Sequence, residues 1–116
     1  HPLGAIRQLN LHHGTLNAIL LPHALRFNRE AALDRLTDLA IRLGVGRGGD
    51  GPGHFITLTE LVLAGLPLPQ RLGDVPGLSR ERIPEYARLA MLDHCHRTNP
   101  RPCAQADMEA ILQRAW

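Results

Sequence analysis

The chain has 116 residues, a formal net charge of +2 with histidine counted as neutral, and hydrophobic residues at 44% of its positions. This length allows one domain with a modest core. The basic side chains are all arginine and alternate with acidic ones, whereas a nucleic-acid-binding protein clusters them on one face. No apolar run is long enough for a membrane span, no signal peptide is visible, and two cysteines make no disulfide framework. We therefore expect a protein of the reducing cytoplasm that binds neither nucleic acid nor membranes.

The first half of the chain predicts two helices. Residues 15–25 carry apolar side chains on nearly every side, which is typical of a buried helix, and Pro22 should kink this helix or split it into two pieces. Asn28 can cap the next helix, in which apolar residues recur with a period of 3.6 residues up to Leu43. Gly44 is suited to end that second helix.

The second half predicts three more helices separated by breakers. Residues 44–54 form a glycine-rich loop, and a third helix fits about 55–65. Residues 66–78 contain three prolines and predict turns. A fourth helix is expected over 83–97 and a last one over about 104–115. The fold class is therefore all-α, a bundle of about five helices.

One glycine-rich motif matches a dinucleotide-binding loop in its spacing but not in its context. Residues 44–49, GVGRGG, match the spacing G-x-G-x-x-G of dinucleotide-binding loops. That motif binds a pyrophosphate only where it follows a strand and opens a helix. Here it follows a predicted helix and leads into more loop, so we interpret it as a surface loop.

A group of metal-binding residue types lies near the end of the fourth predicted helix. His94, Cys95 and His96 are consecutive, and Cys103 follows. Zinc prefers such ligands, but neighbours on a helix point about 100° apart and no paired chelating spacing is present. We therefore favour a buried thiol at Cys95 and two histidines placed favourably near a helix end.

A second candidate is the pair of histidines at the entrance of the first helix. His12 and His13 are adjacent and precede Gly14, which leaves room for a close approach. Adjacent imidazoles do not easily face the same ion, so at most one of them is a ligand. A histidine at a helix entrance is also commonly a capping or surface residue, and spacing alone leaves both interpretations open.

Three stretches resemble one enzyme family. Residues 1–28, HPLGAIRQLNLHHGTLNAILLPHALRFN, are similar to the metal-binding segment of the iron-containing (group III) alcohol dehydrogenases. Residues 65–93 resemble the helical stretch that follows in that family. Residues 98–116, TNPRPCAQADMEAILQRAW, resemble its ending, in which N-P-R precedes a last helix.

The resemblance implies a fold and a chemistry. Family members join a Rossmann-like NAD(P)-binding domain to an all-helical, dehydroquinate synthase-like domain that holds one divalent iron, sometimes zinc, through an Asp and three His. The metal acts as a Lewis acid on the alcohol or carbonyl oxygen during hydride transfer. By position, His13 matches the last metal ligand. His1 matches a histidine beside the metal that has a catalytic or cofactor-side role.

The resemblance also implies what this chain lacks. It corresponds to the C-terminal portion of the helical domain (1–116), without the N-terminal cofactor domain, the Asp or the other His ligands. It begins at His1 within a packed segment, which we interpret as a fragment. We expect the chain alone to bind no NAD(P), iron or zinc, to turn over no small alcohol or aldehyde, and to self-associate through residues 15–25. Two alternatives remain, a maleylacetate reductase-like fragment and a non-catalytic helical interaction module.

Overall fold

The computed structural model describes residues 3, 12–46 and 48–116. The described residues form helices and 3₁₀ turns with no strand, which confirms the all-α fold class. The helices are α1 (His13–Asn28), α2 (Leu33–Arg42), α3 (Gly51–Ala64), α4 (Ile83–Leu92) and α5 (Gln105–Arg114); the turns are η3 (Leu72–Asp74), η4 (Arg80–Arg82) and η5 (His94–Thr98). Among the described residues, no helix combines the length and apolarity needed to cross a bilayer.

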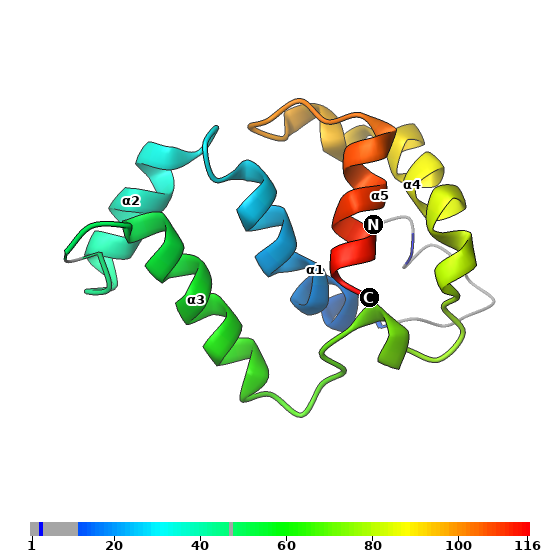
Figure 1. The fold of residues 1–116 in the computed structure, drawn as a ribbon, viewed down its shortest axis with the longest axis horizontal. Helices are drawn as coiled ribbons and strands as arrows, with labels where there is room; N and C mark the ends of the chain where they lie inside the picture. The colour runs from blue at the N-terminus through cyan, green and yellow to red at the C-terminus, as the bar shows by residue number, and fades with distance from the viewer. Residues whose placement is uncertain (1–2, 4–11, 47) are drawn as a thin grey trace.

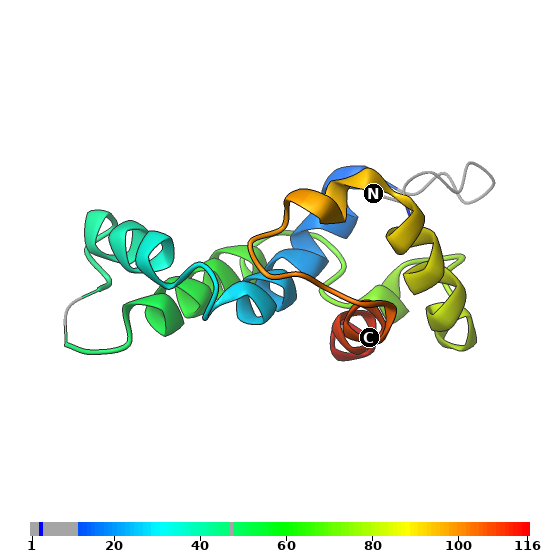
Figure 2. The same cartoon turned by 90° about the horizontal axis from the view of Figure 1, so that it is seen from above.

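α1 is the central element of a flattened molecule measuring 45 × 32 × 19 Å. It contacts α3 on one side and α5 on the other, while α2 pairs with α3 and α4 pairs with α5 (Figures 1 and 2). Two helix pairs thus flank α1. These neighbours cover the apolar surface of residues 15–25 only in part: Leu16 and Ile19 are buried, whereas Leu21 is 44% exposed.

The main core lies between α1, α4, α5 and η3. Tyr86 and Leu72 are its largest fully buried side chains, and the backbone N–H of Leu72 donates to the carbonyl of Ala115 over 2.8 Å. Gly73 allows the C-terminal indole to approach closely, because a Cβ there would lie 2.9 Å from Nε1 of Trp116. The buried members of this core are Leu3, Leu16, Ile19, Leu72, Val75, Ile83, Tyr86, Ala87, Leu112 and Ala115.

α2 and α3 form a separate helical hairpin with a smaller buried seam. Leu36, Ala40 and Ile56 are buried there and do not belong to the main core. The two helices approach closely where Gly51 faces Ala40, since a Cβ on that glycine would lie 3.5 Å from the alanine Cβ. The glycine-rich connection therefore has a packing role.

The first three helices differ from the sequence prediction at two points and agree with it at a third. One helix runs through Pro22, so the segment is not split into two pieces. α3 begins at Gly51 rather than near residue 55, because Asp50 caps it and Pro52 is suited to a first turn. Gly44 ends α2 as predicted, with φ of +73° directly after the C-cap residue.

Asn28 does not cap α2, which begins after Ala32 with no side-chain cap. It is the last residue of α1, and its amide pairs reciprocally with that of Asn99: the two N···O distances are 2.8 and 2.7 Å. Arg101 stacks on Phe27 with its guanidinium carbon 4.2 Å from the ring centroid. Phe27 and Asn28 at the end of α1 therefore contact the N-P-R segment before α5, and we call these contacts the clamp.

The fourth helix ends at Leu92 and does not continue to residue 97. Asp93 adopts an extended conformation with ψ of 136°, and its carboxylate accepts a hydrogen bond from the Cys95 N–H over 2.9 Å. This local bond competes with helical pairing. The 3₁₀ turn η5 follows.

Candidate functional site

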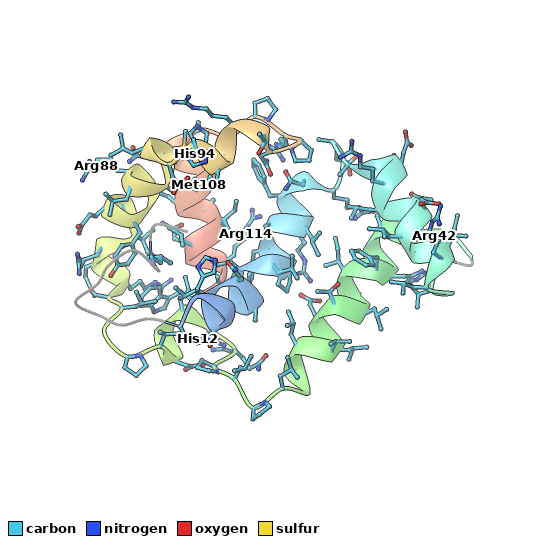
Figure 3. The ribbon with its side chains drawn as sticks, turned by 180° about the vertical axis from the view of Figure 1, so that it is seen from behind. His12, Arg42, Arg88, His94, Met108 and Arg114 are labelled. Carbon is cyan, nitrogen blue, oxygen red and sulfur yellow. The ribbon has the colours of Figure 1, made fainter. Side chains whose placement is uncertain are left out.

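His12 is the capping residue of α1. Its Nδ1 accepts a hydrogen bond from the Thr15 N–H over 3.3 Å and lies 3.2 Å from Thr15 Oγ1. The first N–H groups of a helix have no partner within the helix, so this imidazole satisfies one of them. A ring that accepts at Nδ1 carries its proton on Nε2 when neutral. Figure 3 shows His12 at the N-terminal end of the helix.

Gly14 makes this cap possible. A Cβ at position 14 would lie 3.0 Å from His12 Cε1 and 3.4 Å from Nδ1, which is tighter than ordinary contact. The space beside Gly14, which we expected to admit a ligand, is occupied by the imidazole of His12. The first histidine and the glycine of His-His-Gly therefore have a structural role.

His13 is the first residue of α1 and is exposed. Within the described residues, the group of at least three His, Cys, Asp or Glu that could share one ion does not include His13. His1, the other predicted site residue, lies outside the described residues.

The histidine and cysteine residues after α4 are arranged differently from the prediction. Cys95 is exposed and is not a buried thiol, whereas Cys103 is half-buried. The ligand atoms of Asp93, His94 and Cys95 all lie within 4.8 Å of one another. A hydrogen bond to Asp93 raises the pKa of the Cys95 thiol, and burial raises that of Cys103. The sequence interpretation missed Asp93 because it assigned this residue to the interior of a helix.

A cavity of about 270 Å³ lies between α1, α4, α5 and η5. Its wall is mainly apolar, with Phe27 and Met108 among the lining residues, and Asp93, Cys95 and Cys103 also line it. The exposed sulfur of η5 and the half-buried sulfur before α5 therefore line the same hollow.

A second cavity of about 240 Å³ lies where α1 meets α3 and the turn after it. His23 and Glu60 line it, and Glu60 forms an ion pair with Arg26. Burial lowers the pKa of His23, with Arg26 adding to the shift and Glu60 opposing it. This ion pair joins α1 to α3, so we assign the polar group a structural role.

The glycine motif of residues 44–49 lies after α2, with no strand before it in the described chain. Gly44, Gly48 and Gly49 have positive φ angles, and each is exposed. These glycines shape the connection to α3. The structure agrees with the interpretation as a surface loop.

Comparison with known proteins assigns the chain to a family. Residues 1–116 match the model of the Fe-containing alcohol dehydrogenase family, C-terminal. The chain is 34% identical over 122 residues to 4-hydroxybutyrate dehydrogenase of Cupriavidus necator, covering 99% of this chain and 31% of that protein. It is 33% identical over 120 residues to lactaldehyde reductase of Escherichia coli (strain K12), covering 100% of this chain and 31% of that protein.

A solved structure shows the same fold. The crystal structure of a 1,3-propanediol oxidoreductase superposes with a TM-score of 0.84 at 26% identity, covering 98% of this chain and 30% of that one. The chain spans about a third of the length of the curated relatives it matches. These findings confirm the resemblance that the three sequence stretches indicated. The chain belongs to the iron-containing alcohol dehydrogenase family, in which it corresponds to the all-helical C-terminal part.

Proposed function

We propose that this chain forms part of the metal-binding domain of an NAD(P)-dependent alcohol dehydrogenase and that His13 supplies one protein ligand to a divalent iron or zinc ion. Family membership supports the reaction class, and the relatives named above carry the names of dehydrogenases and a reductase. If His13 held such an ion together with further ligands, the metal would supply Lewis-acid chemistry toward an alcohol or carbonyl oxygen, and a bound NAD(P) would supply the hydride acceptor or donor.

The ligand assignment depends on one observation, which is that the two adjacent histidines occupy different positions: His12 caps α1 and His13 is its first residue. His12 folds back onto Thr15 and closes the first turn of α1, with Gly14 leaving space for its ring. His13 lies at the first helical position, exposed, and is thereby held by a capped helix rather than by a loop. A ligand on a rigid element is better positioned than one on a loop.

The remaining ligands and the cofactor site belong to other parts of a longer protein. A catalytic metal of this kind takes three or four protein ligands at about 2.0–2.2 Å, and this proposal takes only one of them, His13, from the described residues. We therefore expect the 116-residue chain alone to hold no metal at His13, to bind no NAD(P) and to turn over no alcohol. The substrate of the whole enzyme is a small alcohol or aldehyde in this proposal.

Three single variants of the full-length enzyme test the assignment. His13→Ala should remove metal and activity together, because a direct ligand is lost. His12→Ala should retain the metal while destabilising α1 by about 1 kcal/mol, the usual cost of a lost N-cap. His1→Ala should lower turnover more than metal content, in keeping with a role beside the metal.

Metal content by elemental analysis and turnover by nicotinamide absorbance, measured on the same preparations, distinguish these outcomes. Circular dichroism of each variant separates loss of a ligand from loss of the fold. An enzyme that keeps its metal in His13→Ala and loses it in His12→Ala would reverse the assignment.

A further inference from the structure

The turn after α4 brings three consecutive side chains together. Asp93 is extended rather than helical, and its carboxylate accepts the Cys95 N–H over 2.9 Å. The ligand atoms of Asp93, His94 and Cys95 consequently lie within 4.8 Å of one another. Had α4 continued, successive side chains would have pointed about 100° apart, so the early end of the helix creates the cluster.

The spacing of these atoms is close to that of a zinc site. Bond lengths of about 2.3 Å to sulfur and about 2.0–2.2 Å to nitrogen and oxygen place tetrahedral ligands roughly 3.3–3.7 Å apart. Contracting the cluster to that spacing requires side-chain movements of about 1 Å. The His94 side chain is 85% exposed and can make such a movement, whereas that of Asp93 is 16% exposed and already fixed by the turn.

The chemistry of the three groups selects the metal. A carboxylate, an imidazole and a thiolate together suit a borderline-soft divalent cation, whereas calcium and magnesium take oxygen ligands. We propose that Asp93, His94 and Cys95 bind Zn²⁺, with a water molecule in the fourth position. Binding releases the thiol proton to solvent and displaces water from the hydrated ion, with no change of oxidation state.

The neighbouring groups delimit the site. His96 uses Nδ1 to bind the carbonyl oxygen of Asp93, so it holds the turn. Cys103 lines the same cavity as Cys95 but lies outside the three-residue cluster. Cys103 therefore provides a control of matched chemistry, a thiol outside the cluster.

The site is independent of the family's metal centre at His13, which offers no sulfur. It departs from two expectations: that the chain alone binds no zinc, which rested on the number of ligands around His13, and that residues 94–96 hold no zinc, which assumed a helix through residues 83–97. Asp93 joins His94 and Cys95 because it is the extended residue that caps η5.

Cobalt(II) titration of the 116-residue chain, with a phosphine reductant that does not compete for metal, tests the proposal. Sulfur-to-cobalt charge-transfer absorption should saturate at one cobalt per chain and disappear when Zn²⁺ is added. Cys95→Ser should abolish the absorption. His94→Ala should weaken cobalt binding by at least about 10-fold, because the loss of an outer-shell partner alone has that effect and His94 is a direct ligand in this proposal.

Cys103→Ser should bind cobalt with the affinity of the unaltered chain. Circular dichroism confirms that each variant remains folded, so loss of the fold cannot imitate loss of a ligand. Absence of the sulfur absorption at a large molar excess of cobalt, its survival in Cys95→Ser, its loss in Cys103→Ser, or a ratio of one cobalt to two chains would each overturn the site.

Discussion

The main core and the α2–α3 hairpin differ in how much apolar surface they bury. Around Tyr86, residues from α1, η3, α4 and α5 form a continuous buried cluster. The hairpin buries Leu36, Ala40 and Ile56 and leaves many large apolar side chains exposed. The exposed ones are Leu33, Leu39 and Ile41 on α2, Leu43 directly after it, and Leu61 and Val62 on α3.

This difference indicates that the two regions depend on different forces. Burial of apolar area stabilises a fold roughly in proportion to the area removed from water. The main core therefore carries most of the stability, and the hairpin relies on its caps and on polar links to α1. Two such links are the Arg26–Glu60 ion pair and the pair between Arg29 and Asp50, whose N···O distance is 2.9 Å.

The largest expected effect follows from removing the ring at the centre of the main core. Tyr86 is 1% exposed, so Tyr86→Ala should lower the free energy of unfolding by about 3–5 kcal/mol. Urea denaturation followed by circular dichroism measures this loss. Tyr86→Phe is the control and should cost about 1 kcal/mol, because the Ser79 N–H loses its 3.3 Å hydrogen bond to the hydroxyl. Equal effects of the two variants would show that the core does not depend on the ring.

The second effect concerns the clamp at the edge of the core. Asn28→Ala leaves Oδ1 of the half-buried Asn99 without its donor, while Nδ2 still donates to the Arg101 carbonyl, and should cost about 1–2 kcal/mol. The double variant with Asn99→Ala should cost less than the sum of the two single changes, because both groups are then removed. Thermal or urea denaturation of the four proteins gives the coupling energy. Additive effects would contradict a direct pair.

A smaller and local effect is expected in the hairpin. Asp50→Ala removes the cap of α3, in which Asp50 Oδ1 accepts the Gly53 N–H over 2.9 Å, and should cost about 1 kcal/mol. Amide hydrogen exchange should quicken at the start of α3 and remain unchanged in α4 and α5. Asp50→Asn retains a capping side chain and should recover most of the protection. Faster exchange throughout the chain would show that the two regions unfold together.

The smallest effect on stability is expected at the exposed face of α3. Leu61 is 67% exposed, so Leu61→Gln should change the free energy of unfolding by no more than about 0.5 kcal/mol. Because large exposed apolar side chains favour association, this variant should reduce self-association in light scattering. Leu21→Gln on α1 tests the surface that the sequence indicated. The variant that lowers the apparent mass identifies the associating helix.

The helices themselves could be predicted from apolar periodicity, but several of their ends could not. Pro22 lacks an N–H and should disturb a helix, yet α1 continues because this proline is buried among its neighbours, and packing outweighs the lost hydrogen bond. The start of α3 was missed since the glycines before it indicated a loop. The aspartate cap and the first-turn proline were the signals that could have found it.

The candidate sites could likewise be predicted only in part. Spacing alone left both histidines open, the family resemblance matched the second imidazole to a metal ligand, and the structure adds that the first one caps the helix. The convergence of Asp93 with His94 and Cys95 depends on one backbone angle, a ψ of 136°, which periodicity does not report. An aspartate that can accept the N–H two residues ahead is the only sequence signal of that turn.

The central position of α1 has a consequence for the order in which the chain folds. α2 and α3 follow one another directly, so their contacts close a short loop, whereas α1 meets α5 only after nearly the whole chain has been drawn together. Closing longer loops costs more entropy, and contacts of long sequence separation slow folding. During synthesis the hairpin can form as soon as it leaves the ribosome. The main core, which stabilises the molecule, must wait for the final helix.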